Sequence, residues 1–243
     1  MGGTGVVGRH VVDGLRAAGH EPVVVARSTG VDVAAGSGLD EAIAGSQVVI
    51  DVSNVAALGR AASERFFRAA TTNLIEAGSR AGVEHFVVLS IVGCDRVDMG
   101  YYMGKRLQEA IALEGKLPVS VVRATQFHEF PTQLLERAPR GPVVPIPRMR
   151  SQTVAAQEAA QALVDVALGT PVGRAGDVAG PEVHEMADLV RLVLRARSSR
   201  RIVARMRMPG AVGKGLATDG LLPMGDYRRG KQTFAEWLAA SSH

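Results

Sequence analysis

Three side chains in the middle of the chain have the types and order needed for proton transfer to a carbonyl oxygen. Tyr101 and Lys105 are four residues apart in the stretch GYYMGK, so on a helix they share a face. A phenol with a pKa of about 10 is a poor proton donor or acceptor at neutral pH. An adjacent ammonium lowers that pKa because it stabilises the phenolate. Ser90, at the end of an apolar run, is expected to hold the carbonyl through its hydroxyl.

The spacing leaves two interpretations of this pattern open. Tyr102 lies directly beside Tyr101, so spacing does not decide which phenol faces the reacting groups. Alternatively, both tyrosines pack under a loop while Lys105 is solvated. The position of the pattern, after a glycine-rich turn and a serine-bearing strand, favours a cofactor-dependent catalytic site.

That glycine-rich turn opens the chain as MGGTGVVGRH, with glycines at positions 2, 5 and 8. Early glycines permit a tight turn, the middle one lets the backbone approach a pyrophosphate, and the last allows close packing of a helix. The amino end of the following helix offers free N–H groups and a positive dipole end to phosphates. A flexible N-terminus is the alternative. We predict that the turn binds a dinucleotide through Gly2, Thr4, Gly5, Val6, Val7 and Gly8.

The charged residue that ends the next apolar run selects between two dinucleotides. An acidic residue at this strand end holds the ribose 2′-hydroxyl of NAD, whereas an arginine pairs with the 2′-phosphate of NADP. The run here is Pro22–Arg27, and Asp32 lies five residues beyond Arg27, after Gly30. We therefore predict NADP in preference to NAD. The alternative for Arg27 is a surface arginine at a strand end.

Short apolar runs alternate with amphipathic stretches along the chain, which predicts a parallel sheet covered by helices on both faces. The expected fold class is α/β, a doubly wound parallel sheet of the Rossmann type. Strands are predicted at 22–27, 47–52, 85–91 and 119–123, and helices at 6–18, 39–44, 60–81, 101–113, 154–168 and 186–197. Prolines after residue 130 indicate an irregular crossing, and residues 205–230 are expected to form a loop. We expect an NAD(P)-binding domain over 1–130 and a small C-terminal substrate-binding lobe over 131–243.

The strand that normally precedes such a turn is not in the sequence, because only Met1 stands before Gly2. In this fold that strand is central, and its loss removes a ladder partner from its neighbours. We expect a strand of about five to eight residues to be absent, so that Met1 is a misplaced start or a truncation.

Charge and composition argue against several classes of partner. Residues 191–231 hold eleven Lys or Arg and two acidic residues, a local charge of +9 in a chain of +4. We interpret them as a solvated basic face and not as a nucleic-acid contact, because the arginines lack interleaved aromatic residues. No apolar stretch reaches roughly 18 to 20 residues, and the six histidines show no metal-ligand spacing, so neither a membrane nor a metal is expected. The single cysteine, Cys94, fits a cytoplasmic protein.

These stretches together resemble the atypical short-chain dehydrogenases/reductases, in the group of NmrA-like NAD(P)-binding proteins. The resemblance is carried, in order, by GGTGVVGRHVV, VVVARS, VVIDVSN, FVVLSIVGCDR, YYMGKRLQE, VVRATQFHEF and AGPE. It implies that the glycines of the turn contact the pyrophosphate. The other contacts that it implies are Arg27 and Ser28 at the adenosine phosphate, Val52 and Ser53 at the adenosine, Lys105 at the nicotinamide ribose, and Thr125, Gln126 and Phe127 beside the nicotinamide.

Members of this group include reductases of quinones or other carbonyls, and also NADP-binding regulators without turnover. Because Ser90, Tyr101 and Lys105 preserve the elements of an active triad, the resemblance implies an NADP-preferring oxidoreductase with these residues as the catalytic ones. Its substrate is expected to be a small carbonyl or quinone compound. The alternative is a non-catalytic NADP sensor that acts through a protein partner.

Overall fold

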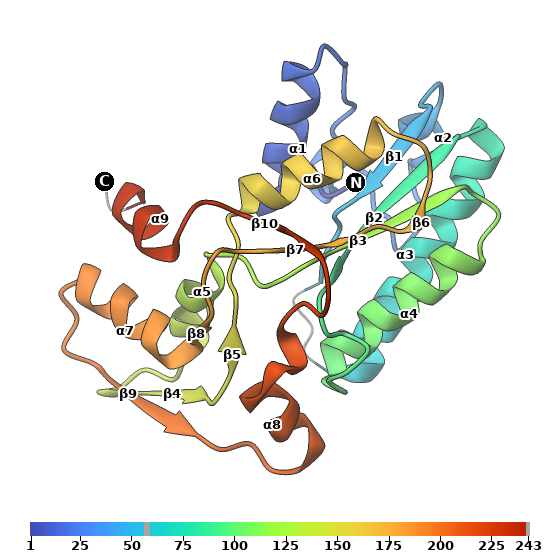
Figure 1. Ribbon diagram of the computed structural model, residues 1–243. Coiled ribbons are helices and arrows are strands. Elements are labelled where there is room, and N and C mark those ends of the chain that lie inside the picture. The colour runs from blue at the N-terminus through green and yellow to red at the C-terminus, as the bar shows by residue number, and fades with distance from the viewer. Residues whose placement is uncertain (56–58, 242–243) are drawn as a thin grey trace.

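The β-branched runs form the centre of a parallel sheet in the computed structural model, which describes residues 1–55 and 59–241 (Figure 1). The strands follow the order β1-β2-β3-β7-β10, and each neighbouring pair is parallel. Their bounds are β1 (Val48–Asp51), β2 (His85–Ile91), β3 (Val119–Ala124), β7 (Asp177–Ala179) and β10 (Tyr227–Arg229), and a short strand β6 (Gly173–Arg174) also pairs with β3. The predicted α/β fold with a parallel central sheet is confirmed.

Helices cover both faces of the sheet, because strands this apolar are buried on both sides (Figure 1). One face carries α3 (Arg60–Ala81) and α4 (Gly100–Glu114), with α2 (Leu39–Ile43) packed against α3. The other carries α1 (Val6–Ala17) and α6 (Ala156–Ala167), which pack against each other. Among the described residues, no helix combines the length and apolarity needed to cross a membrane.

Met1 lies at the position where a strand before the glycine turn is expected. Its amino group donates to the carbonyl of Ile50, and its own carbonyl accepts from the N–H of Val52 at 3.1 Å. On the other side, the N–H groups of Gly2 and Gly3 donate to the carbonyl of Val25 at 2.8 and 3.3 Å. Met1 and the two glycines therefore connect β1 with the segment around Val25 through hydrogen bonds on both sides, as one residue pair of a parallel strand does.

The strand predicted over Pro22–Arg27 is wrong. The segment has no assigned strand, and β1 is the edge strand of the sheet. Its valines favour a strand, but a strand forms by pairing, and here the Met1–Gly3 segment hydrogen-bonds only to the carbonyl of Val25 within this run. Residues Arg27–Thr29 form a single 3₁₀ turn, η1, that Gly30 ends in the left-handed conformation (φ +84°).

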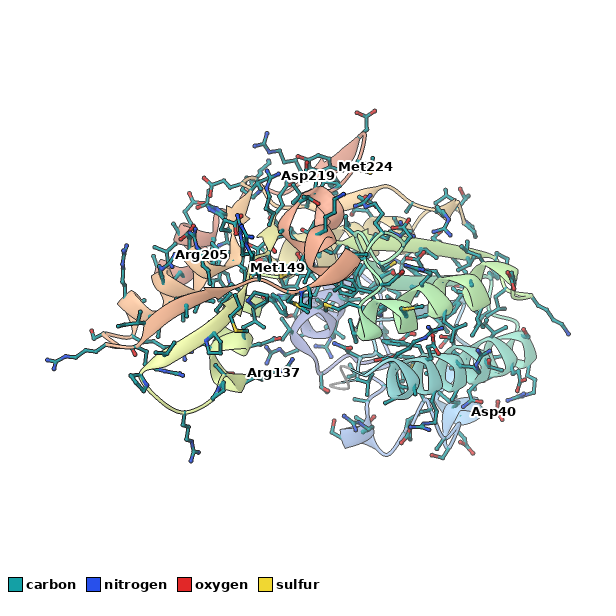
Figure 2. All side chains as sticks on the ribbon, turned by 90° about the horizontal axis from the view of Figure 1, so that it is seen from below. Asp40, Arg137, Met149, Arg205, Asp219 and Met224 are labelled. Carbon is teal, nitrogen blue, oxygen red and sulfur yellow. The ribbon has the colours of Figure 1, made fainter. Side chains whose placement is uncertain are left out.

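Elements after residue 130 divide between the sheet and a second group, which we call the C-terminal lobe. In the lobe β4 pairs in parallel with β9, and β5 pairs antiparallel with β8. The lobe comprises β4 (Val143–Pro147), β5 (Arg150–Ser151), β8 (His184–Glu185), β9 (Ile202–Met206), α5 (Phe130–Arg137), α7 (Met186–Ala196), α8 (Gly210–Ala217), η2 (Asp219–Leu221) and α9 (Phe234–Ala240). Figure 2 shows Arg205 and Asp219 on the lobe and Asp40 at the opposite end of the molecule. Because α6, β6, β7 and β10 return to the sheet, the boundary at residue 130 stays a prediction.

The loop predicted over residues 205–230 is also wrong, because α8, η2 and β10 lie within it. Glycine disfavours a helix, and α8 holds Gly210, Gly213 and Gly215. Packing overrides this propensity, since Leu216 of α8 is buried in the same apolar cluster as Val97. The irregular crossing predicted after residue 130 likewise contains α5 and β4.

Gly104 allows α4 to lie close against α3. A Cβ atom at this position would lie 2.7 Å from Cβ of Ser63 and 2.9 Å from Cδ2 of Phe67. Such distances exclude any side chain unless the two helices separate. The crossing sets the depth of Tyr101 and Lys105, which flank Gly104 on the same helix.

Gly104→Ala is expected to lower the free energy of unfolding, measured by urea denaturation. Overpacking between the helices destabilises the fold by about 1 to 3 kcal/mol, and the higher helix propensity of alanine than of glycine offsets about 1 kcal/mol of this. Gly176→Ala is the matched control, because no heavy atom lies within 4 Å of the position that its Cβ atom would take. A Gly104→Ala chain as stable as the unsubstituted one would show that the helices adjust freely.

Candidate functional site

The glycine turn is pressed against the end of β1. A Cβ atom on Gly2, whose φ is +75°, would lie 2.9 Å from the carbonyl oxygen of Val52. A Cβ atom on Gly8 would lie 2.1 Å from the carbonyl oxygen of Gly2. Both positions therefore require glycine, and the contact places the turn at the carboxyl end of a parallel strand, where open α/β sheets bind ligands.

Helix α1 begins at this turn with unsatisfied N–H groups. Its N-cap, Gly5, is extended and provides no side-chain cap, and the first turn contains no acidic residue. The first N–H groups of a helix have no intrahelical acceptor, so they and the helix dipole favour a bound phosphate. The residues predicted to bind pyrophosphate lie together in this turn: Gly2, Thr4, Gly5, Val6, Val7 and Gly8.

A buried hydroxyl beside the turn has no hydrogen-bond partner. Ser53 follows β1, and its Oγ is buried and unpaired in the described structure. Its backbone N–H is already fixed by Oδ1 of Asp51 at 2.8 Å and lies 3.0 Å from the Cβ position of Gly2. Because burying an unpaired hydroxyl costs about 1 to 3 kcal/mol, a polar ligand at the turn would stabilise this residue. Ser53, with Val52 next to it, thus fits the dinucleotide that the turn predicts.

Arg27 and Asp32 differ in whether their charged groups already have hydrogen-bond partners in the protein. Arg27 and Ser28 are exposed in η1, and the side chain of Arg27 contacts no acid among the described residues. Asp32 is held by its own loop, since Oδ1 accepts from the N–H groups of Ala34 and Ala35 at 2.8 and 3.1 Å. The free charge at the end of the Pro22–Arg27 run is therefore positive.

Lys105 points into the interior of the molecule. Its Nζ donates to the carbonyl of Leu89 at 2.9 Å and to Oε1 of Gln108 at 2.8 Å, and it lies 4.4 Å from the ring centroid of Phe67. The side chain is 4% exposed. Burial lowers the pKa of Lys105 to about 8, against the opposing effect of the negative charge of Asp51. The alternative in which Lys105 is solvated is therefore excluded.

A buried carboxylate links Lys105 to the cofactor side of the sheet. Gln108 accepts from Lys105 and donates through Nε2 to Oδ2 of Asp51 at 2.8 Å, while Oδ1 of Asp51 accepts from Ser53. Asp51 and Gln108 are both fully buried. Sequence reasoning missed both residues. The available signals were an acid inside the apolar run VVID and a glutamine three positions after Lys105, on its helix face.

The two tyrosines face different parts of the molecule. The hydroxyl of Tyr101 donates to Oδ1 of Asn54, in the segment after β1, at 2.7 Å. Tyr102 is buried, and its hydroxyl accepts from Nε2 of Gln126 at 3.2 Å. Tyr101 therefore reaches the segment that also carries Ser53, whereas Tyr102 packs within the lobe cluster.

The predicted lowering of the Tyr101 pKa by Lys105 is not what the structure shows. Burial raises the pKa of Tyr101 well above its usual value, the charge of Tyr102 adds to this, and the hydrogen bond with Asn54 opposes it. The reason is that the ammonium of Lys105 is directed to Leu89 and Gln108. A phenol in this state stays protonated at neutral pH, so it is a proton donor and not a base.

Ser90 lies beside a buried network of charged side chains. Its Oγ lies 3.9 Å from Sγ of Cys94, which donates to Oε1 of Glu109 at 3.4 Å, and the Ser90 hydroxyl helps to lower the pKa of Glu109. Glu109 also pairs with Arg123 at 2.7 Å and with Arg174 at 2.8 Å. Burial opposes ionisation of Glu109, but these hydrogen bonds hold its pKa at about 2. Burial raises the pKa of the Cys94 thiol to about 12, which makes the thiol unreactive at neutral pH.

The three predicted catalytic side chains lie on β2 and α4 and have separate partners. Tyr101 bonds to Asn54, Lys105 to Leu89 and Gln108, and Ser90 to the Glu109 network. No hydrogen bond joins any two of them in the described part of the chain.

The segment predicted to border the nicotinamide follows β3. Thr125 donates through Oγ1 to the carbonyl of Gln152, and Phe127 forms an isolated parallel bridge with Val154. Phe127 also packs on the cluster that contains Val7 of α1. The Oε1 atom of Gln126 is buried without a partner in the described structure, which leaves an acceptor for a ligand amide. This segment thus lies between the turn helix and the lobe.

Residues 1–92 match the NAD dependent epimerase/dehydratase family. None of the curated proteins compared with the chain matches it.

Solved structures similar over nearly the whole chain show the same fold. An NADPH-dependent quinone oxidoreductase from Escherichia coli has a TM-score of 0.71 and 15% identity over 98% of this chain and 97% of its own. A dTDP-glucose 4,6-dehydratase mutant from Streptomyces venezuelae, solved with NAD, has a TM-score of 0.70 and 16% identity over 99% and 94%. A short-chain dehydrogenase/reductase superfamily protein from Agrobacterium tumefaciens, with bound NAD, has a TM-score of 0.66 and 17% identity over 99% and 94%.

Lys105→Met is expected to change how stability depends on pH. The folded pKa is about 8 and the ordinary value is 10.5, so between these pH values the unfolded chain binds more protons than the folded one. This residue therefore contributes a free energy of unfolding that rises with pH, by on the order of 3 kcal/mol from pH 7 to pH 10.5. Urea denaturation at several pH values should show the variant losing this rise, relative to the unsubstituted chain. Lys116→Met, which removes an exposed lysine, is the control; parallel curves for Lys105→Met and the unsubstituted chain would contradict the burial of this charge.

Proposed function

We propose that the protein is an NADP-preferring oxidoreductase of the NmrA-like group that reduces a small carbonyl or quinone compound. The observation that carries this proposal is the uncapped amino end of α1, set by the glycine turn against the unpaired hydroxyl of Ser53. When bound, NADPH supplies a hydride. The similarity in fold to an NADPH-dependent quinone oxidoreductase supports this class of reaction.

Binding is assigned to the glycine turn, to the residues after β1 and to the segment after β3. The N–H groups of the turn and of the first turn of α1 hold the pyrophosphate, and Arg27 with Ser28 holds the 2′-phosphate. Val52 and Ser53 contact the adenosine. Thr125, Gln126 and Phe127 contact the nicotinamide, for which Gln126 offers its unpaired Oε1.

Tyr101 is assigned as the proton donor. Its hydroxyl is oriented by Asn54, and its raised pKa keeps the proton in place at neutral pH. Lys105, charged below about pH 8, acts on Tyr101 only at a distance as a buried positive charge, because its ammonium is directed to Leu89 and Gln108. Ser90 is assigned to hold the substrate carbonyl through its hydroxyl, and it follows Leu89, whose carbonyl accepts from Lys105, in β2. The single cysteine, a free buried thiol, suits a cytoplasmic location.

A second candidate function is an NADP-binding regulator without turnover. It is favoured by the separate engagement of Ser90, Tyr101 and Lys105, each of which has its own protein partner. In this case the C-terminal lobe contacts a protein partner when the dinucleotide is bound.

Tyr101→Phe is expected to lower the steady rate of NADPH oxidation by at least about 100-fold, because proton transfer contributes about 10² to 10⁴ in rate. Activity is measured across a panel of quinones and aldehydes, with NADPH affinity measured separately and expected to be unchanged. Tyr102→Phe is the control and keeps kcat within a few-fold. Tight NADPH binding by the unsubstituted chain, with no turnover on any compound, would refute the proposed enzymatic function and favour the NADP-binding regulator.

Arg27→Ala is expected to raise the dissociation constant of NADPH at least tenfold and that of NADH less than twofold. The reason is that the charge-assisted hydrogen bond to the 2′-phosphate is lost only for NADPH. Arg16→Ala removes an equal charge from the exposed end of α1 and should leave both dissociation constants unchanged. Fluorescence titration provides the measurement. Equal effects of Arg27→Ala on the two dinucleotides would refute the NADP preference.

A further inference from the structure

The basic segment of residues 191–231 is neutralised unevenly in the folded chain. Most of its arginines have partners. Arg191 and Arg205 both pair with Asp188, Arg197 with Glu136 and Arg228 with Asp165, while Arg201 donates to the carbonyls of Pro139 and Gly141. Figure 2 shows Arg205 at the surface of the lobe. Ion pairs and hydrogen bonds therefore engage most of these arginines, and two of the remaining cations of the segment, Arg207 and Lys214, line one pocket.

Three cations without a partner line the same pocket. Arg148, Arg207 and Lys214 are exposed and line an open pocket of about 310 Å³, and none of their side chains has a hydrogen bond or ion pair with any described residue. Neighbouring arginines that lie outside the pocket, such as Arg205 and Arg150, are paired with acids. The pocket therefore holds a local charge of three that the described protein does not balance.

The cations come from two walls that are fixed by packing. One wall is a face of α8, on which the lining residues are spaced three and four apart: Gly210, Gly213, Lys214 and Ala217. The opposite face of α8 buries Leu216 in the apolar cluster of the lobe. The second wall is the end of the β4–β9 pair, where Arg148 follows β4 and Arg207 follows β9. The N–H of Arg148 donates to the carbonyl of Met206 at 2.8 Å, which ties these two ends together.

The amino end of α8 adds to the positive field. The helix begins at Gly210, its N-cap Pro209 provides no side-chain cap, and its first turn has no acidic residue. Its first N–H groups and its dipole therefore favour an anion beside the three cations. The nearby acids Asp188 and Asp219 do not supply one, because they pair with arginines outside the pocket.

The arrangement suits a phosphate better than a carboxylate. A carboxylate balances one positive charge, whereas a phosphate monoester carries about −1.5 to −2 at neutral pH and has three strong acceptor oxygens. Two planar guanidinium groups and one ammonium offer the bidentate and point-charge contacts that phosphate oxygens accept. The rest of the wall is apolar or glycine, including Met208 and Ala217. The cavity therefore also has room for a non-polar part of the ligand.

We propose that the lobe pocket between α8 and the β4–β9 end is a binding site for a phosphate-bearing small molecule. The site is separate from the glycine turn, because its walls come from the C-terminal lobe alone. It goes beyond the proposed redox function and does not depend on it. It also assigns a ligand to the part of the basic segment that internal ion pairs do not explain.

The test is a calorimetric titration of the full chain with inorganic pyrophosphate, in the presence and absence of saturating NADP so that binding at the glycine turn is recognised. Arg207→Ala and Lys214→Ala are expected to weaken the NADP-independent binding at least tenfold each. Arg200→Ala removes an equal charge from an exposed arginine of the same segment, outside the pocket, and should bind as the unsubstituted chain does. In amide NMR spectra, pyrophosphate should shift the signals of Gly210 and Gly213 and leave Gly5 unmoved when NADP is present.

Three results would overturn the site. The first is unchanged pyrophosphate binding in both pocket variants. The second is an equal loss in Arg200→Ala, which would indicate only a diffuse charge effect. The third is tighter binding of a short DNA duplex, weakened by Arg200→Ala as much as by the pocket variants, which would assign the surface to nucleic acid. Failure of NADP to bind at all would refute the redox proposal and leave this measurement intact.

Discussion

The structure depends on one backbone contact, that of the glycine turn with the end of β1. Gly2 lies where any Cβ would meet the carbonyl of Val52, and Gly8 where any Cβ would meet Gly2. This contact sets the start of α1, and therefore the direction of its free N–H groups. It also places the turn beside Ser53, the hydroxyl that the protein leaves unpaired. A side chain at either glycine would move the helix end away from the strand, so the same two residues determine the geometry of the proposed anion site.

From that contact a chain of buried polar groups extends beneath the site. Asp51 fixes Ser53 through one oxygen and Gln108 through the other, and Gln108 fixes Lys105. A buried ammonium is stable only when it is hydrogen-bonded and offset by opposite charge, and this chain provides both. Hydrogen bonds thus connect Ser53, at the proposed adenosine contact, with Lys105, at the proposed proton-transfer site. Loss of Asp51 would leave the charge of Lys105 without its main compensation.

The sequence was sufficient where periodicity is strong and burial is local. Helix α3 has the predicted bounds, and β1 to β3 agree within two residues, because apolar runs and amphipathic spacing report directly on burial. Pro22–Arg27 and α8 were mispredicted because pairing of a strand and packing of a glycine-rich helix depend on distant residues. At the site, the spacing placed Tyr101 and Lys105 on one helix. It did not tell which way each side chain turns, since that is set by Asn54, Leu89 and Gln108, which lie on other elements or further along α4.

These orientations set the protonation state from which the proposed chemistry starts. A Tyr101 phenol whose pKa is raised by burial already carries the proton that carbonyl or quinone reduction consumes. Reduction leaves a phenolate, which burial disfavours and which Lys105, turned toward Leu89, does not stabilise by contact, so Tyr101 regains a proton from solvent before the next turnover. Lys105 still acts at a distance as a buried positive charge, and it loses that charge as the pH rises through about 8. Burial thus keeps Tyr101 protonated and also limits the pH range in which Lys105 is charged. The proposed reduction is therefore favoured below about pH 8.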